Sequence, residues 1–263
     1  MSPPVDVAYE VRGTPDGPVV LLANSLGCTS LVWDGVMPAL ERWFRVIRFD
    51  LRGHGRSPVP PGPYTIADFG ADVVALLDRL EVPQANVAGL SIGGMAALWL
   101  AANVPERVAR LAILCSSARL GPASYWAARA ETVLGEGIGE IADAVVGRWL
   151  TPDYAASHPE LMARLRAMLV AQPVDGYVAS CRAIERMDLV ADLERIAADT
   201  LVVSAIGDLA IPVDHARVIA AGIPHARLAI VDDAAHLASL ERPAEVAELL
   251  IDHFSRGRPE ERP

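Results

Sequence analysis

A serine flanked by glycines lies between an apolar run and a helix-prone segment. The motif Gly89-Leu90-Ser91-Ile92-Gly93-Gly94 follows residues 85–88 and leads into residues 95–102. A serine at a tight strand-to-helix turn has a strained backbone, and side chains two positions away on either side would collide with the turn. Glycines at both of those positions remove the collisions. The motif predicts a nucleophile elbow and hence serine hydrolase chemistry; a purely structural glycine turn is the alternative.

The helix that begins after Ser91 would supply hydrogen-bond donors to an oxyanion. Free N–H groups and the positive end of the helix dipole gather at a helix N-terminus, and the N–H of Ile92 is the first of them. We expect the second donor at Leu26 N–H, in the loop Asn24-Ser25-Leu26-Gly27. One such donor typically contributes roughly 100- to 1,000-fold in rate. The side chain of Asn24 either contacts substrate or fixes this loop through neighbouring backbone.

An acid and a base follow the serine in the chain order Ser, Asp, His, which is the order expected when the serine lies at a nucleophile elbow of a parallel sheet. Asp208 follows the apolar residues 200–204, and His236 follows residues 226–231. Parallel strands would bring both side chains to the sheet edge that carries Ser91. His236 would accept the serine proton and return it to the leaving group, while Asp208 would hold the imidazole tautomer and stabilise the imidazolium.

The competing residues have simpler explanations. Asp232 and Asp233 are too near His236 in sequence to reach its far ring nitrogen readily. The segment 48–57, which contains His54, is interpreted as a hydrogen-bonded loop clamp. Surface or structural roles are favoured for the other histidines, which are His158, His215, His225 and His253.

The composition excludes several other chemistries. All 23 basic residues are arginine, so a Schiff-base lysine, a pyridoxal phosphate anchor and a phosphate-loop lysine are impossible. The 3 cysteines are too scattered for a disulfide framework, and no Cys or His spacing fits a metal site, so we expect no metal and no cofactor. The net charge of −10 argues against a nucleic-acid partner. An anionic substrate would need a local arginine.

Length and hydropathy predict one main soluble domain. The 263 residues are 52% hydrophobic, but no apolar run approaches the roughly 20 residues that a membrane helix needs. The first residues also lack the basic and apolar pattern of a secretory leader. We therefore expect a cytoplasmic protein with a small-molecule partner and no membrane partner, and a homo-oligomer stays open.

Apolar runs alternate with segments of helical period, which predicts a mostly parallel sheet with helices on both faces. The strands 5–12 and 19–23 are predicted to form a hairpin, because a turn rich in glycine and proline joins them. The further expected strands are 44–49, 86–88, 111–115, 200–204 and 226–231. The expected core helices are 66–80, 92–103, 213–221 and 243–254.

Between residues 118 and 199 the alternation stops, and helices are expected at 124–134, 138–150, 159–171 and 175–187. An insertion at this point of the chain would lie beyond the C-terminal ends of the strands, where ligands bind in such sheets. Residues 119–198 are therefore predicted to be a helical lid, here called the lid segment; extra core helices are the alternative. The core would comprise residues 1–118 and 199–255, and the charged tail 256–263 is predicted to be disordered.

Taken together, these residues resemble the α/β-hydrolase superfamily and, more narrowly, the 3-oxoadipate enol-lactonases of aromatic-acid catabolism. The resemblance runs from about residue 7 to residue 254. It implies an α/β fold whose mostly parallel sheet is flanked by helices and carries an inserted helical lid. The narrower marks are Asn24-Ser25-Leu26-Gly27, Asp50-Leu51-Arg52-Gly53-His54-Gly55, Gly89-Leu90-Ser91-Ile92-Gly93-Gly94-Met95, Trp99-Leu100-Ala101, Ser124-Tyr125-Trp126-Ala127-Ala128-Arg129, Arg148-Trp149-Leu150-Thr151-Pro152 and Ala234-Ala235-His236-Leu237.

The resemblance implies a substrate, namely a five-membered enol-lactone with an acetate arm that water opens to 3-oxoadipate. Ser91 would attack the ring carbonyl. Arg129 would bind the carboxylate of the arm, and Trp126 and Trp149 would line an apolar pocket. A solvated Arg129 and packing roles for both tryptophans are the alternatives.

One departure from the family concerns the acid. Ala205 and Gly207 stand where the family more often has a glycine and an acidic residue before the catalytic aspartate. This difference leaves the shape of the Asp208 loop open.

The same three residues would serve other hydrolases of this fold. A general carboxylesterase, a perhydrolase and a carbon–carbon bond hydrolase differ only in the pocket, and a non-catalytic ligand receptor is the alternative from another class. A haloalkane dehalogenase is excluded, because it needs a carboxylate at the elbow where this chain has Ser91.

Overall fold

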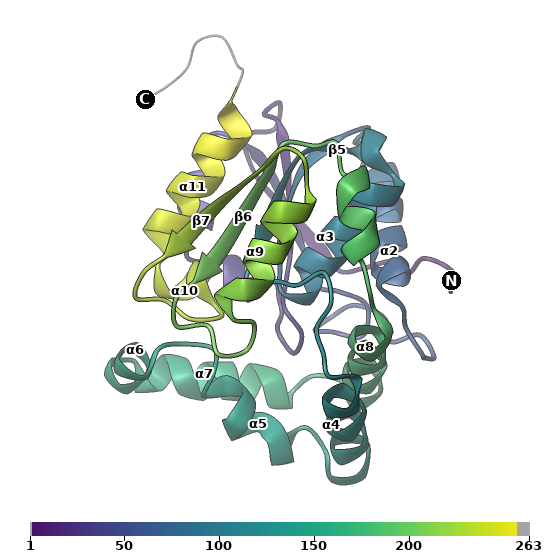
Figure 1. The fold of residues 1–263 in the computed structure, drawn as a ribbon, viewed down its shortest axis with the longest axis vertical. Helices are drawn as coiled ribbons and strands as arrows, with labels where there is room; N and C mark the ends of the chain where they lie inside the picture. The colour runs from purple at the N-terminus through teal and green to yellow at the C-terminus, as the bar shows by residue number, and fades with distance from the viewer. Residues whose placement is uncertain (1, 257–263) are drawn as a thin grey trace.

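The computed structural model describes residues 2–256, which form a central sheet covered by helices (Figure 1). Within these residues the sheet has seven strands in the order β1-β3-β2-β4-β5-β6-β7, and all neighbours except β1 and β3 are parallel. The predicted mostly parallel sheet is therefore confirmed. Apart from Arg256, the predicted disordered tail lies outside the described residues. The strands are β1 (Tyr9–Gly13), β2 (Val19–Ala23), β3 (Arg45–Phe49), β4 (Ala85–Leu90), β5 (Val108–Leu114), β6 (Thr200–Ala205) and β7 (Ala226–Val231).

The predicted hairpin between the first two strands is wrong, because β3 lies between them. β1 pairs antiparallel with β3, and β2 pairs with the other edge of β3 in parallel. The turn that joins β1 to β2 bonds to β3 as well: Thr14 N–H donates to Phe44 O, and Arg45 N–H donates to Pro18 O, each at 3.0 Å. The turn therefore leaves a gap between β1 and β2 that β3 fills. This pairing joins segments far apart in the sequence, and a local turn pattern does not reveal it.

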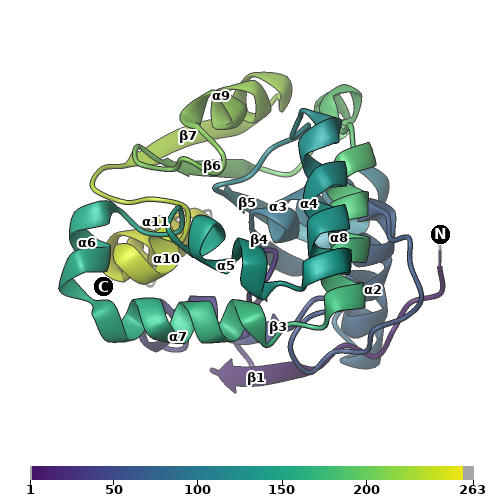
Figure 2. The same cartoon turned by 90° about the horizontal axis from the view of Figure 1, so that it is seen from below.

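Helices cover both faces of the sheet, with α2, α3 and α9 on one face and α11 on the other (Figures 1 and 2). The short helix α1 packs against α11. α2 begins with a capping box, since Thr65 Oγ1 accepts from Asp68 N–H and Asp68 Oδ2 accepts from Thr65 N–H. The helices outside the lid segment are α1 (Met37–Leu40), α2 (Ile66–Arg79), α3 (Ile92–Asn103), α9 (Val213–Gly222), α10 (Ala238–Glu241) and α11 (Pro243–Ser255), with the 3₁₀ turns η1 (Ser30–Trp33) and η2 (Pro105–Arg107).

The lid segment leaves the sheet after β5 and returns before β6, and its helices lie at the end toward which the strand arrows point in Figure 1. The short helix α6 was not expected, since six residues are too few to show a helical period. The elements of the segment are α4 (Ala123–Glu136), α5 (Gly139–Val146), α6 (Pro152–Ser157), α7 (Pro159–Val170), α8 (Val174–Arg186) and the 3₁₀ turn η3 (Val190–Arg195).

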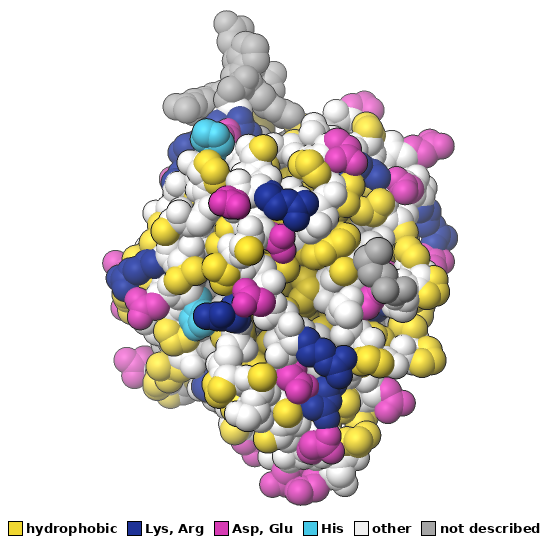
Figure 3. Space-filling model, turned by 45° about the vertical axis from the view of Figure 1, so that its right-hand side comes forward, with side chains coloured by type: hydrophobic (Ala, Val, Ile, Leu, Met, Phe, Trp, Pro, Cys, Tyr) yellow, Lys and Arg dark blue, Asp and Glu magenta, His cyan; other side chains and the backbone are white. Residues whose placement is uncertain are grey.

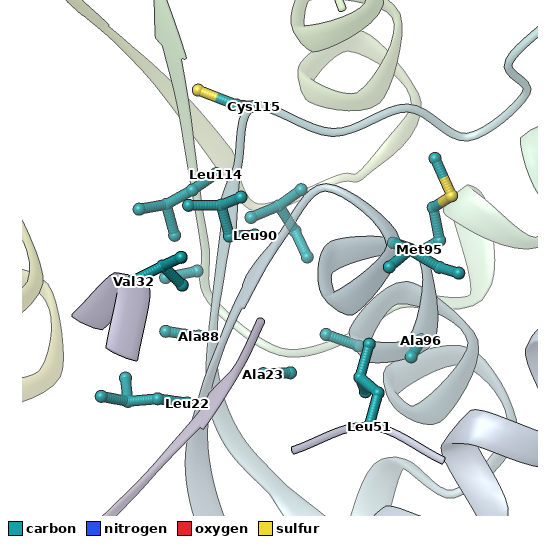
Figure 4. Packing of buried hydrophobic residues seen from close by; sticks show 14 of the residues in the cluster. Leu22, Ala23, Val32, Leu51, Ala88, Leu90, Met95, Ala96, Leu114 and Cys115 are labelled. Atoms are coloured by element: carbon teal, nitrogen blue, oxygen red, sulfur yellow. The ribbon is translucent and has the colours of Figure 1, made fainter. Parts of the chain in front are cut away.

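The core lies between the sheet and the helices, where side chains from β2, β4, β5 and α3 pack together (Figure 4). Leu22, Leu90, Met95 and Leu114 are all fully buried. Truncating a buried leucine to alanine typically costs about 2–5 kcal/mol. This packing fixes the strand ends, and therefore the loops that follow them.

On the face shown in Figure 3, acidic and arginine side chains are interspersed among hydrophobic ones, and neither positive nor negative charge forms a continuous patch. Many of the arginines in the described residues pair with carboxylates, for example Arg107 with Asp78 and Arg110 with Asp199. Most of the positive charge on the described residues is therefore neutralised locally.

Candidate active site

Ser91 occupies the sharp turn between β4 and α3, as the elbow motif predicts. Its backbone has φ 58° and ψ −119°, a conformation that a residue with a side chain rarely adopts. A Cβ at Gly89 would lie 2.3 Å from Gly93 O, and a Cβ at Gly93 would lie 2.5 Å from Ala23 O. Both glycines are therefore required by the close approach of β2, β4 and α3.

The backbone around Ser91 is held from two sides. Ser91 N–H donates to Leu114 O at 2.9 Å, and Met95 N–H donates to Ser91 O at 3.0 Å. The hydroxyl of Ser116 also donates to Ser91 O, at 2.6 Å. These bonds stabilise the strained turn and present its side chain at the strand end.

The two amides expected to bind an oxyanion have no hydrogen-bond acceptor within residues 2–256. Ile92 is the first residue of α3, and its N–H belongs to the free donors of the helix N-terminus. Leu26 follows the first residue of a turn in which Cys28 N–H donates to Ser25 O at 3.1 Å and Gly27 has φ 75°. The turn therefore leaves Leu26 N–H available.

Asp208 and His236 form a buried pair. Nδ1 of His236 lies 2.9 Å from Asp208 Oδ2, and both residues are 3% exposed. The other carboxylate oxygen accepts from the N–H groups of Ala210 at 2.8 Å and Ile211 at 2.9 Å. Because Asp208 is an acceptor, Nδ1 carries the proton, and Nε2 is left with a free lone pair. The loop with Ala205 and Gly207 thus has a shape that brings Asp208 to His236.

His236, whose Nε2 is free to accept a proton, lines the same cavity as Ser91. Ser25 Oγ lies 3.4 Å from Nε2, a weak contact, and no hydrogen bond joins Nε2 to Ser91 in the described part of the chain. Catalytic hydrogen bonds are often long before substrate binds. Sequence reasoning missed Ser25, although its place beside Leu26 in the Asn24-Ser25-Leu26-Gly27 loop could have indicated it.

The lid segment supplies the opposite wall of this cavity, with Trp126, Arg129 and Trp149 as the sequence predicts. The indole N–H of Trp126 donates to Leu120 O at 3.0 Å, so this ring has a fixed orientation. The cavity is lined by Ser25, Leu26, Ser91, Leu120, Tyr125, Trp126, Arg129, Val145, Arg148, Trp149, Ile184, Ala210, Ile211 and His236. A larger groove of about 690 Å³ lies between α1 and α11 and contains none of the candidate residues.

Two arginines in the cavity wall, Arg129 and Arg148, have no acidic partner among the described residues. The Arg129 guanidinium lies 5.2 Å from the ring centre of Trp126 and 5.4 Å from that of Tyr177, and its Nε–H is buried without an acceptor. It donates through Nη2 to Tyr177 OH. A desolvated, unpaired cation is costly unless an anion joins it.

Arg148 was missed as a candidate site residue. Its Nη2 donates to Tyr125 OH at 2.9 Å, and its Nε donates to Ala144 O at 3.1 Å. Burial opposes ionisation of the Tyr125 phenol, but the hydrogen bond from Arg148 and the positive charges of Arg129 and Arg148 outweigh burial and lower the Tyr125 pKa. The phenol oxygen thus lies in the field of both guanidinium groups, a place that suits a carboxylate oxygen.

Asn24 does not line the cavity. It is fully buried, its Nδ2 donates to Cys28 O, and its Oδ1 accepts from Leu51 N–H at 3.3 Å. These bonds join the Leu26 loop to the segment after β3. The loop-fixing role is therefore favoured over substrate contact, because the side chain has no free polar atom to offer.

The loop-clamp interpretation of residues 48–57 fits the structure. The buried carboxylate of Asp50 accepts from Ser30 N–H at 2.8 Å and from Arg56 N–H at 3.1 Å. His54 lies outside the cavity lining, and burial lowers its pKa. It is a buried neutral side chain rather than a second base.

Residues 2–256 offer few signs of a different kind of site. No group of three or more His, Cys, Asp or Glu residues is placed to hold a metal ion there. None of the described helices combines the length and apolarity needed to cross a bilayer. The thiols of Cys28, Cys115 and Cys181 are free and buried, and burial raises the pKa of Cys115 well above its usual value.

The chain matches known proteins over most of its length. A family model described as the alpha/beta hydrolase fold matches residues 18–243. The 3-oxoadipate enol-lactonase 2 of Acinetobacter baylyi is 35% identical over 240 residues, which cover 90% of each chain. The crystal structure of the enol-lactonase from Burkholderia xenovorans LB400 is 36% identical, has a TM-score of 0.93, and the match covers 96% of this chain and 97% of that one. A malate-bound thermophilic esterase from Thermogutta terrifontis is 29% identical, with a TM-score of 0.89 and coverage of 95% and 93%.

Proposed function

The chain belongs to the α/β-hydrolase family, and we propose that it is a serine hydrolase that opens a small anionic enol-lactone, 3-oxoadipate enol-lactone or a close analogue, through an acyl-enzyme. The observation that carries the proposal is one cavity that Ser91, His236 and two unpaired arginines line together. The names of the Acinetobacter and Burkholderia relatives support the choice of substrate.

In the first step His236 acts as general base. With its Nδ1 proton held by Asp208, the imidazole accepts the Ser91 proton at Nε2 as the serine oxygen attacks the lactone carbonyl. The carboxylate stabilises the imidazolium that forms. The ring oxygen then leaves as an enolate, which takes the proton from the His236 imidazolium and becomes a ketone, so the leaving group does not readily reverse the attack and His236 is again a base.

The negative charge on the carbonyl oxygen is stabilised by backbone donors. Leu26 N–H and Ile92 N–H are free, and the dipole of α3 adds a positive field at the same place. A water molecule activated by His236 then attacks the acyl-enzyme and releases the second carboxylate of the product. We also propose that the enzyme acts in the cytoplasm.

The acetate arm of the substrate binds at the lid wall, which is the part of the cavity lining that the lid segment supplies, including Trp126, Arg129, Arg148 and Trp149. Arg129 offers a buried Nε–H without an acceptor, and Arg148 lies beside it across Tyr125. A guanidinium suits a carboxylate because its N–H groups match both oxygens. The related Thermogutta esterase holds malate, a dicarboxylate, which is consistent with an anionic ligand in this scaffold.

The proposal is tested with a substrate panel. We expect fast loss of the ultraviolet absorbance of 3-oxoadipate enol-lactone on adding enzyme, with kcat/KM at least about 100-fold above that for neutral p-nitrophenyl acetate, about 2.7 kcal/mol in transition-state binding. The methyl ester of the lactone is the matched control, since it removes only the charge of the arm.

Two results would overturn parts of the proposal. Equal kcat/KM for the lactone and its methyl ester would remove the anionic substrate and leave a general carboxylesterase. Absence of turnover with every ester and lactone would favour a ligand receptor on this fold.

A further inference from the structure

Glu241, at the end of α10, is a buried carboxylate that binds two separate parts of the chain. Its Oε2 accepts from Ala235 N–H at 2.9 Å, and Ala235 directly precedes His236. Its Oε1 accepts from Thr151 N–H at 3.1 Å and from the Thr151 hydroxyl. Thr151 belongs to the lid segment, two residues after Trp149. One carboxylate therefore joins the His236 loop to the lid wall.

A second contact runs parallel to this bridge. Leu237 N–H, on the other side of His236, donates to Trp149 O at 2.8 Å. The His236 loop is thus tied to the segment 149–151 both before and after the histidine. The Thr151 side chain also leaves little room beside the acid loop, since a Cβ added at Gly207 would lie 3.3 Å from the Thr151 methyl carbon.

The chemistry of the bridge favours a fixed geometry. Glu241 is 4% exposed and has no basic partner among the described residues, so its charge is satisfied by N–H and O–H donors alone. Hydrogen bonds to an ionised acceptor are short and strong, and a partly satisfied buried carboxylate is costly. Displacement of the lid wall therefore cannot occur without straining the bonds that hold the His236 loop.

We propose that Glu241 is a positioning residue that couples the lid segment at 148–151 to the imidazole of His236. The coupling rests on the proposed function, because it matters only if His236 is the base. Substrate bound at Arg148 and Trp149 then stabilises the hydrogen bonds between residues 149–151 and the His236 loop, and these bonds set the distance from His236 to Ser91. Binding at the lid wall therefore favours the conformation in which His236 is correctly placed as a base.

Thr151 provides the first test, since it touches Glu241 but not His236 or Ser91. T151V removes the hydroxyl donor and keeps the shape, and T151S is the matched control that keeps the donor. We expect T151V to lower kcat for p-nitrophenyl acetate, a short neutral ester, by about 5-fold with KM unchanged, because small misplacements of a base are costly in rate. T151S should match the wild type.

E241Q should have the larger effect. The amide has only one acceptor oxygen, and its NH₂ would face an N–H donor, so one side of the bridge must open. We expect a loss of about 10- to 100-fold in kcat for p-nitrophenyl acetate and a raised KM for the anionic lactone. If E241Q does not fold, the T151V and T151S pair carries the test alone.

Hydrogen exchange gives a readout that does not depend on activity. In T151V the amides of Ala235 and Leu237 should exchange at least several-fold faster than in T151S, although both variants differ from the wild type only at Thr151 in the lid segment. Unchanged exchange together with an unchanged kcat in T151V would overturn the proposal and leave Glu241 a stabilising residue only.

Failure of the proposed function looks different. A wild type that hydrolyses p-nitrophenyl acetate but not the lactone would refute the substrate, while the kcat comparison still decides the coupling. A wild type without any turnover would refute the hydrolase, and hydrogen exchange would then decide whether Glu241 joins the two loops.

Discussion

The strand ends and the lid wall hold their side chains in different ways. Ser91, Asp208 and His236 each follow a parallel strand, and backbone hydrogen bonds and glycine contacts fix their loops. Arg129 and Arg148 are instead held by aromatic rings and phenol oxygens on separate parts of the lid segment. The strand-end side chains are therefore placed by backbone geometry, whereas the lid-wall arginines are placed by contacts between side chains.

The largest expected effect separates two hydroxyls at the strand ends. S91A should lower kcat by at least about 10⁴-fold for every substrate, because the proposed acyl-enzyme forms on the Ser91 oxygen. S25A should lose about 10-fold at most, although Ser25 Oγ lies 3.4 Å from His236 Nε2. Steady-state rates on p-nitrophenyl acetate check both variants. A larger loss in S25A than in S91A would show that the elbow does not carry the nucleophile.

Removing the charge of a lid-wall arginine should weaken the binding of an anionic substrate and leave the turnover of a neutral ester unchanged. R129M keeps a long apolar side chain and removes the guanidinium, so we expect KM for the anionic lactone to rise about 10- to 100-fold, or about 1.4–2.7 kcal/mol. R148M should give a smaller increase, since Arg148 is less enclosed and bonds to Tyr125 and Ala144. Neither variant should change kcat/KM for p-nitrophenyl acetate. Equal losses for charged and neutral substrates would mean that both arginines only support packing.

The stability of the protein should depend on pH through His253, a buried residue of α11. Burial chiefly, with help from nearby arginines, lowers the pKa of His253 from 6.5 to about 4. The native state thus binds fewer protons than the unfolded chain, so stability is present above pH 6.5 and is lost as pH falls toward 4. Between pH 7.5 and 5.5 this group alone should reduce the free energy of unfolding by about 1.3 kcal/mol.

Urea unfolding at the two pH values measures this loss. H253Q, whose amide can still donate to Leu111 O as the ring does at 2.9 Å, should show a smaller difference between pH 7.5 and 5.5. An identical difference in the variant and the wild type would assign the pH dependence to other groups.

The smallest expected effect concerns the backbone of the elbow itself. S116A removes the hydroxyl that donates to Ser91 O at 2.6 Å in a buried setting. We expect a loss of about 1 kcal/mol in the free energy of unfolding and a decrease of a few-fold in kcat with KM unchanged. A change in KM for the lactone would instead show that the elbow and the lid wall are not independent.

Sequence reasoning found the strand-end residues because their signals are local. Gly89 and Gly93 are placed where a Cβ would strike backbone, so the motif states a steric requirement that any such turn must meet. The same reasoning failed for β1, whose choice of β3 as partner depends on residues more than 30 positions away.

The lid wall was harder to predict because its contacts cross between helices. Arg129, in α4, has no acidic residue three or four positions away on either side, and this missing intrahelical partner was a usable signal for an unpaired cation. Arg148 follows α5, where no such spacing rule applies. Ser25 and Glu241 offered less, since their importance comes from bonds to His236 and Ala235 that join distant segments.

The identity of the nucleophile is tested most directly by covalent labelling followed by mapping of the adduct. A fluorophosphonate should modify Ser91 alone, and labelling should fall at least about 100-fold in H236A, because the imidazole must accept the serine proton. An adduct on Ser25 or another residue, or equal labelling in H236A and the wild type, would contradict the claim that Ser91 is the nucleophile activated by His236.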